Sequence, residues 1–224
     1  TEYYAHLASC RKLPTTSQPS PELFEKFYLE AAAAGDEVLG IFLSHELSGT
    51  WQCAKLAADL ANVDNVLFVD SATVCLGESL LVRLAVQLRD AGKTLVQIAT
   101  DLKYLRKGGR LPAAVAVAGG MLGIKPLITI KDGKVAMAGK ARGLPGAYVA
   151  LFKKIEELGG ISPDFAAVAG YSSSLREVQP IENYFRENLH MGEPLVRQIG
   201  CVIGTHAGPG AFGLAFFDNG LVID

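Results

Sequence analysis

Short apolar runs alternate with amphipathic stretches along the first half of the chain. Val38–Leu43 and Asn65–Ser71 are runs of apolar residues, which predict two buried strands. Trp51–Leu60 and Gly77–Ala91 place apolar residues at helical spacing and predict helices. Strands separated by helices pair in parallel, so this half is expected to form an α/β unit with a Rossmann-like parallel sheet.

Two further helices are expected around these elements. Ser20 can cap a helix that starts at Pro21, and Gly35 is placed to end it. Another helix starts after Thr94 and reaches about Tyr104.

The second half has a different pattern. Two β runs, Pro126–Lys131 and Val135–Gly139, meet at Asp132-Gly133, which predicts a hairpin. The small apolar residues of Pro112–Leu122 predict a helix. The other expected elements are helices at 144–158 and 175–189 and strands at 165–171, 195–204 and 211–217. This pattern is typical of an α+β unit whose sheet is partly antiparallel.

The change of pattern near residues 105–110 predicts a domain boundary. We expect a first domain at residues 1–106, an α/β unit with hydroxyl-rich loops at its strand ends. Residues 107–224 are expected to form the second domain, of the α+β type. A chain of 224 residues is long enough for two modest domains.

Composition narrows the function classes. Apolar residues make up 50% of the chain and the formal net charge is −2, with no run of Lys and Arg, so a nucleic-acid partner is not expected. No apolar stretch approaches the roughly 20 residues of a membrane span. The four cysteines form no CxxC pair, and the first residues lack the basic start and apolar stretch of a secretory signal. We therefore expect a cytoplasmic protein with reduced thiols.

The loop between the first predicted strand and its helix is the richest candidate site. It offers the hydroxyls of Ser44, Ser48 and Thr50, and Gly49 lets backbone N–H groups approach a ligand. The helix that follows favours an anion at its N-terminus. The loop suits a carboxylate or phosphate, although Ser48 and Thr50 could also do no more than cap the helix.

Three other polar clusters accompany this loop: Thr15-Thr16-Ser17-Gln18-Pro19, Lys107-Gly108-Gly109-Arg110 and Gly204-Thr205-His206-Ala207-Gly208-Pro209-Gly210. Each has a plain structural alternative, as a turn, a helix end or a histidine bonded to a carbonyl. The four clusters fall two in each expected domain. That distribution favours a ligand site in a cleft between the domains.

Other chemistries find less support. A Ser/His hydrolase acting on acyl esters or thioesters, with Ser48 and His206, remains an alternative, but no Gly stands two residues before Ser48 as in a nucleophile elbow. The four histidines show no metal-ligand spacing. Neither a Walker pattern nor GxGxxG is present, so we expect no nucleotide, metal or other cofactor.

These motifs, taken together and in order, resemble those of the bacterial DegV family of fatty-acid-binding proteins. The resemblance runs from Leu13 to Phe217. It is carried by TTSQPSP at 15–21, LSGT at 47–50, Val69-Asp70-Ser71 with Gly77, and the stretches 102–110, 124–143 and 203–213.

The resemblance implies a non-catalytic carrier with two domains and one long-chain fatty acid between them. It implies that the carrier presents the carboxylate to a fatty acid kinase, which phosphorylates it. The implied carboxylate ligands are Thr16, Ser48 and His206, with Thr15, Ser17, Gly49 and Thr205 around them. Arg110 and Arg142 would lie at the head-group mouth or dock the kinase.

The tail would supply most of the affinity, about 0.8 kcal/mol for each buried CH₂. The small residues of Pro112–Leu122 would wall its tunnel or, alternatively, allow close packing of a helix on a sheet. Two departures from the family pattern stand out. The chain has no counterpart of the strand and DST-type loop that precede TTSQP, and an internal segment is missing between Ile98 and Asp101. We therefore expect the first domain to lack sheet strands and one side of the tunnel.

Overall fold

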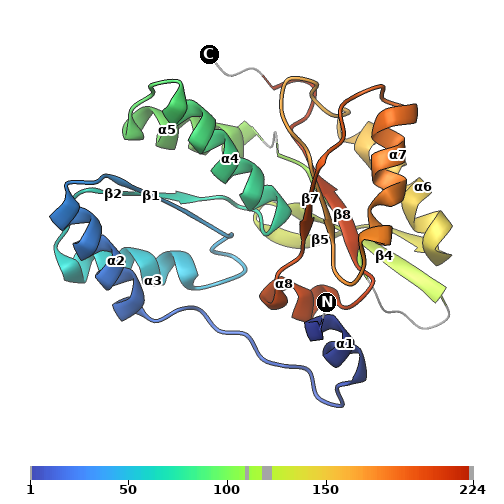
Figure 1. Cartoon of the computed structure of the whole chain (residues 1–224), viewed down its shortest axis with the longest axis horizontal. Helices are drawn as coiled ribbons and strands as arrows, with labels where there is room; N and C mark the ends of the chain where they lie inside the picture. The colour runs from blue at the N-terminus through green and yellow to red at the C-terminus, as the bar shows by residue number, and fades with distance from the viewer. Residues whose placement is uncertain (1, 109–110, 118–122, 222–224) are drawn as a thin grey trace.

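The computed structural model describes residues 2–108, 111–117 and 123–221, which form two sheets (Figure 1). The smaller sheet pairs β1 (Val38–Phe42) with β2 (Val66–Asp70) in parallel. The larger sheet has six strands in the order β5-β4-β3-β8-β6-β7. A mixed α/β fold with one parallel and one partly antiparallel sheet is therefore confirmed.

Helices cover both faces of the parallel pair. The helices α2 (Pro21–Ala34) and α3 (Thr50–Ala61) lie on one face, and α4 (Leu76–Asp90) and α5 (Leu95–Gly108) lie on the other (Figure 1). Gly35 ends α2 in a left-handed conformation with φ +76°, as expected of a glycine C-cap. Ser20 stands at the N-cap but makes no capping hydrogen bond through its side chain.

The six-stranded sheet is antiparallel except at one edge, where β6 and β7 run in parallel. Its hairpin is the predicted one, with Asp132 and Gly133 both at positive φ, as a type I′ turn requires. The helices α6 and α7 lie along one face of this sheet (Figure 1). The elements of this part are β3 (Ala113–Ala116), β4 (Ile124–Lys131), β5 (Lys134–Arg142), α6 (Gly143–Glu157), β6 (Val168–Tyr171), η2 (Leu175–Glu177), α7 (Gln179–Glu187), β7 (Leu195–Gln198), α8 (Cys201–Ala207) and β8 (Phe212–Ala215).

The prediction of a helix at Pro112–Leu122 is wrong where the structure describes it. Residues 113–116 form β3, which pairs with β4 on one side and β8 on the other. The backbone of β3 lies close to Gly213 of β8, since a Cβ on Gly213 would come 2.6 Å from the carbonyl oxygen of Ala114. Strand pairing thus overrides the helix propensity of alanine. Residues 118–122 lie outside the described part.

The predicted strand at 195–204 is also wrong in its second half. The strand β7 ends at Gln198, and α8 begins after Gly200, so Thr205 and His206 lie on a helix. The helix expected at 175–189 is divided into η2 and α7, with Pro180 in the first turn of α7. Proline has no N–H and fits that first turn, so the chain restarts a helix there.

One helix, α4, belongs to the core of both sheets. Its buried Leu80 and Leu84 share a cluster with Val69 of β2 and with Val168 and Ala215 of the larger sheet. The two sheets are therefore packed through a common apolar layer.

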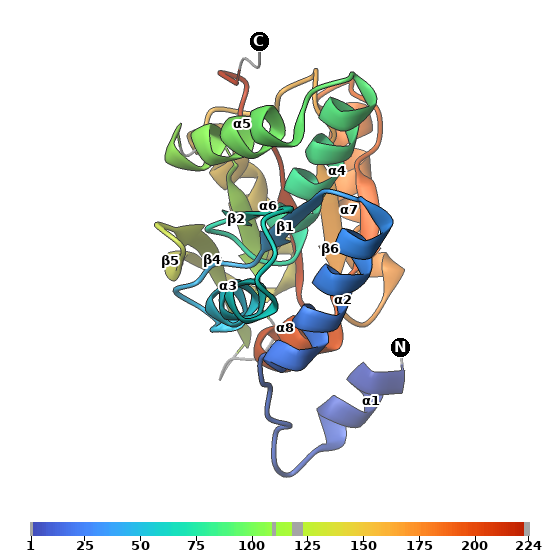
Figure 2. The same cartoon turned by 90° about the vertical axis from the view of Figure 1, so that its left-hand side faces the viewer.

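The N-terminal helix α1 (Glu2–Ser9) packs against α8, which comes near the end of the sequence (Figure 2). Tyr4 is buried there, and its hydroxyl donates to the carbonyl of Ile199 at 2.6 Å. Residues 2–9 thus contact the part of the chain assigned to the second domain, while the division at 106/107 itself stays a prediction.

Candidate functional site

An extended segment brings two of the expected ligands together. Residues 10–20 run from α1 to the start of α2 without regular structure (Figure 1). On this segment Thr16 Oγ1 lies 3.2 Å from Nε2 of His206 on α8. Both side chains are exposed, so their polar atoms are accessible to a ligand.

The same segment contacts the loop that follows β1. The side chain of Gln18 lies against Gly49, so closely that a Cβ at position 49 would overlap its Oε1. One residue further, the carbonyl of Pro19 accepts a hydrogen bond from the Cys53 thiol at 3.2 Å. Gln18 was present in the TTSQPSP motif but was not selected as a site residue. The segment therefore joins α8 to the N-terminus of α3.

Ser48 contributes to the start of α3. Its Oγ lies 2.8 Å from Thr50 Oγ1 and accepts the N–H of Thr50 at 3.2 Å. Gly49, the N-cap residue, offers no side chain for capping. The N–H that Ser48 accepts belongs to the first residue of α3, and no side chain makes a capping hydrogen bond at Gly49. The half-buried hydroxyls of Ser48 and Thr50 stand together at a helix N-terminus, where backbone N–H groups favour an anion.

A histidine–aspartate hydrogen bond joins this loop to the end of β2. Nδ1 of His45 lies 2.6 Å from Oδ2 of Asp70, which is buried at the end of β2. Asp70 also accepts the backbone N–H groups of Ala72 and His45, at 3.0 and 3.3 Å. Sequence reasoning did not select either residue, although Asp70 stood in a quoted motif at a strand end. The pair fixes the β1 and β2 ends relative to each other.

The β4–β5 hairpin reaches the same loop. Lys134 Nζ forms an ion pair with Glu46 Oε2 at 3.2 Å. A Cβ added to Gly133 would lie 2.6 Å from Oγ of the buried Ser44. The larger sheet thus contacts the hydroxyl-rich loop through its hairpin turn.

The other expected site residues are placed differently. Thr15 and Ser17 are exposed on the extended segment. Thr205 is buried, with its hydroxyl bonded to the Tyr3 hydroxyl and to the carbonyl of Cys201, so it faces α1 and not Thr16. Arg142 is exposed where β5 meets α6. Arg110 lies outside the described residues.

The pKa of one carboxyl group near the loop after β1, that of Glu78, is shifted. Burial in the first turn of α4 raises the pKa of Glu78 from its usual 4.5 to about 7, although backbone hydrogen bonds at Cys75 and Leu43 favour the charged form. Leu43 directly follows β1, so Glu78 lies at the carboxyl end of that strand. Burial also raises the pKa of the neighbouring Cys75 thiol. Burial at this end of the parallel sheet therefore favours the protonated forms of Glu78 and Cys75.

The described residues contain no group of His, Cys, Asp and Glu side chains suited to holding a metal ion. Within the same part of the chain, no helix is both long and apolar enough to cross a membrane.

The sequence is also similar to those of known proteins. A family model described as "uncharacterised protein, DegV family" matches residues 1–219. A DegV domain-containing protein of Deinococcus radiodurans is 35% identical over 225 residues, which cover 92% of this chain and 78% of that protein.

Two solved structures are similar in fold. A DegV lipid-binding protein from Thermotoga maritima has a TM-score of 0.84 at 27% identity, with 96% of this chain and 80% of that chain covered. A fatty-acid-binding DegV family protein from Thermus thermophilus has a TM-score of 0.84 at 31% identity, with 96% and 83% covered.

Proposed function

Because the chain belongs to the DegV family, we propose that it binds a long-chain fatty acid between residues 1–106 and residues 107–224. The observation that carries this proposal is the contact between Thr16 and His206, which links an early segment of the chain to α8. Two solved DegV relatives, from Thermotoga maritima and Thermus thermophilus, are described as lipid-binding and fatty-acid-binding.

The carboxylate of the fatty acid would bind to the hydroxyl groups where residues 10–20 meet α8 and the N-terminus of α3. Thr16, Ser48 and His206 would donate to its oxygens, and the α3 N-terminus would add the favourable field of its N–H groups. Neutral donors desolvate at lower cost than a buried arginine would. A carboxylate bound in this way is held firmly but is still available to a second protein.

The apolar tail would lie in the layer that α4 shares with both sheets. Buried Leu76 and Leu80 of α4 and Ala113 of β3 belong to this layer. About 0.8 kcal/mol for each buried CH₂ gives a chain of roughly sixteen carbons on the order of 10 kcal/mol before ordering costs. The tail therefore supplies the affinity and the head group supplies the orientation.

We also propose that this chain performs no chemistry on its ligand and presents the carboxylate to a fatty acid kinase. Arg142 supports this role because it is exposed, basic and positioned where β5 meets α6. A hydrolase would need Ser48 and His206 in mutual contact, whereas Ser48 is bonded to Thr50 and His206 to Thr16. Arg110 remains a second candidate for the docking surface.

The test has a lipid arm and a kinase arm. Mass spectrometry of lipid extracted from the purified protein should detect a long-chain fatty acid, and added oleate should bind. The double variant Thr16→Val with Ser48→Ala should lose at least tenfold in oleate affinity, while Ser20→Ala, whose side chain makes no capping bond, should not. Protein that is always empty and fails to bind oleate would refute the proposal.

In the kinase arm, Arg142→Ala should retain oleate but yield less acyl phosphate when a fatty acid kinase and ATP are added. Turnover of a p-nitrophenyl acyl ester that disappears in Ser48→Ala would instead establish the hydrolase.

A further inference from the structure

Cys75 and Cys201 are far apart in sequence, yet each stands at the start of a helix. Cys75 is the N-cap residue of α4, and Cys201 is the first residue of α8. Both are free thiols, of which Cys75 is half-buried and Cys201 is exposed. The backbone N–H of Gly200, the residue before Cys201, donates to the Cys75 sulfur. The starts of the two helices therefore meet at these cysteines.

Strand β6 of the larger sheet positions both helix starts. Leu76, the first residue of α4, packs on Gly170 of β6 so closely that a Cβ at position 170 would come 2.5 Å from its Cδ2. The N–H of Ile199, just before α8, donates to the carbonyl of Tyr171 at 2.8 Å. Two neighbouring residues of one strand thus fix the segments that carry the two thiols.

The buried side chain of Tyr4 lies at the same junction. Its hydroxyl donates to the carbonyl of Ile199 at 2.6 Å. Burial raises the pKa of Tyr4 to about 12, with smaller contributions from the charges that the nearby Cys201 and Cys75 carry when ionised. One hydroxyl of α1 is therefore a neighbour of both thiols.

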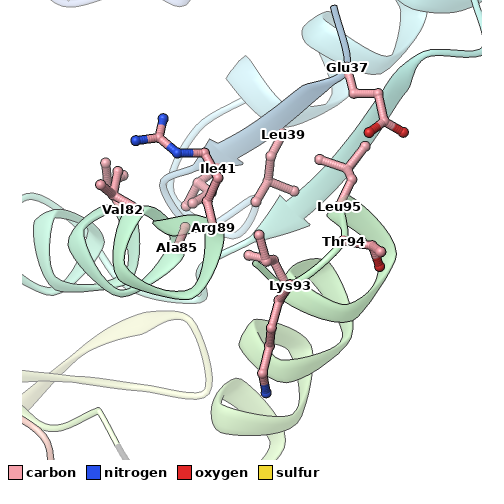
Figure 3. A pocket seen from close by; sticks show the side chains of 11 residues that line it. Glu37, Leu39, Ile41, Val82, Ala85, Arg89, Lys93, Thr94 and Leu95 are labelled. Atoms are coloured by element: carbon pink, nitrogen blue, oxygen red, sulfur yellow. The ribbon is translucent and has the colours of Figure 1, made fainter. Parts of the chain in front are cut away.

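The other end of α4 is fixed by the small sheet. The second half of this helix lines a groove of about 570 Å³ over β1, and Figure 3 shows Val82, Ala85 and Arg89 of α4 along it. The two cysteines are not among the residues that line this groove. Because α4 extends from β1 to the start of α8, a covalent bond at its first turn would tie α8 to the small sheet.

We propose that Cys75 and Cys201 form a reversible disulfide when hydrogen peroxide oxidises the protein. The Cys201 thiolate first takes an oxygen atom from the peroxide; the O–O bond breaks, water leaves and a sulfenic acid forms. The Cys75 sulfur then attacks the Cys201 sulfur. The S–S bond forms, the S–O bond breaks, and the hydroxyl group leaves as a second water with the proton of the Cys75 thiol. Each peroxide thus removes two electrons from the pair of thiols.

The order of these steps follows from the surroundings of the sulfur atoms. Cys201 is exposed, so the oxidant reaches it first. Burial raises the pKa of the Cys75 thiol, which therefore stays protonated and reacts slowly with peroxide by itself. Cys53 is protected, because it is buried and its thiol donates to the carbonyl of Pro19 at 3.2 Å.

The disulfide would change how firmly α8 is fixed in the fold. This helix carries His206, whose Nε2 lies 3.2 Å from Thr16 Oγ1. A cross-link between distant parts of a chain stabilises its folded state, so oxidation should also stabilise the contact of α8 with the segment 10–20. Release of a bound fatty acid should then become slower, and this last consequence alone rests on the proposed function.

The test treats the reduced full chain with hydrogen peroxide, blocks the remaining thiols with iodoacetamide and digests the protein without reductant. Mass spectrometry should detect a peptide pair linked through Cys75 and Cys201, and the monomer should have lost two of its four thiols. The melting temperature of the oxidised monomer should rise by several degrees. Dithiothreitol should reverse both changes.

Cys201→Ser, at an exposed position, should abolish the linked peptide and the rise in melting temperature, and Cys75→Ser should do the same. Cys10→Ser is the matched control and should preserve both. Three results would overturn the proposal: oxidation stops at a sulfinic acid on Cys201, the disulfides join separate chains only, or Cys10→Ser also abolishes the linked peptide.

Oleate release is measured separately on the oxidised and the reduced protein. Release that is at least threefold slower after oxidation would support the coupling of the disulfide to the ligand site. A linked peptide in a protein that never binds oleate would refute the proposed function and leave the disulfide established, so the two failures are distinguishable.

Discussion

Nδ1 of His45 lies 2.6 Å from Oδ2 of Asp70, so the loop after β1 is bonded directly to the end of β2. The carboxylate is buried and accepts two backbone N–H groups as well as the imidazole. The hydroxyls of Ser48 and Thr50 stand on the same loop, a few residues further on. The position of these hydroxyls thus depends on a hydrogen-bonded pair, His45 and Asp70, that is itself outside the proposed ligand set.

Asp70→Asn should therefore destabilise the protein by about 2–3 kcal/mol, because hydrogen bonds to a buried charge are lost or weakened. It should also weaken oleate binding, since the loop that holds Ser48 is no longer fixed. Urea unfolding and oleate titration measure the two effects. Asp90→Asn is the matched control, because Asp90 is exposed and bonded to the adjacent Arg89. Equal stability of the two variants would contradict the role given to Asp70.

Glu78 should make stability depend on pH. Its pKa is about 7 in the folded protein against 4.5 ordinarily, so the folded state binds the proton more tightly than the unfolded state. Stability should therefore fall as the pH rises from about 4.5 to about 7, with the full loss present above that window. The pKa difference corresponds to a loss on the order of 3 kcal/mol.

Glu78→Gln should remove this contribution. The free energy of unfolding of the variant, relative to the original protein, should increase steadily between pH 4 and pH 8 in urea titrations. Glu187→Gln, at an exposed position on α7, is the matched substitution. A constant difference between Glu78→Gln and the original protein across this range would show that Glu78 ionises normally.

Gly204→Ala should displace α1 from α8. Gly204 is buried, and a Cβ there would overlap the ring and hydroxyl of Tyr4. Overpacking of this kind costs about 1–3 kcal/mol. Limited proteolysis should then cut the segment 10–20 faster, and oleate should bind less tightly because Thr16 loses its fixed position beside His206. Gly192→Ala is the control, since a Cβ at that position meets nothing within 4 Å.

Gly133→Ala should loosen the contact between the hairpin and the loop after β1. Position 133 has φ +77°, which alanine adopts with strain, and its Cβ would lie 2.6 Å from Ser44 Oγ. We expect a loss of about 1–3 kcal/mol in thermal or urea unfolding. Gly139→Ala on β5, where a Cβ would meet nothing within 4 Å, should cost much less. Similar losses at the two positions would mean that the hairpin turn does not contact the loop as described.

Local patterns determined much of the fold. The apolar runs at β1 and β2 predicted strands because a buried parallel strand needs nonpolar side chains on both faces. Asp132-Gly133 predicted its hairpin because these two residues tolerate positive φ. Both signals lie within a few residues of the feature that they specify, so they can be recognised in the sequence.

The sequence motifs also selected Thr16, Ser48 and His206, but only the tertiary structure decided that Thr16 and His206 lie in contact. Thr16 and His206 are 190 residues apart in sequence and come together because α1 packs on α8. Strand β3 is likewise a strand because β4 and β8 flank it, since its alanines alone favour a helix. The sequence by itself therefore determined the elements whose signals are local and the residue types of the site. The fold decided β3, α8, the His45–Asp70 pair and the junction of Cys75 with the start of α8, because each depends on contacts between distant segments.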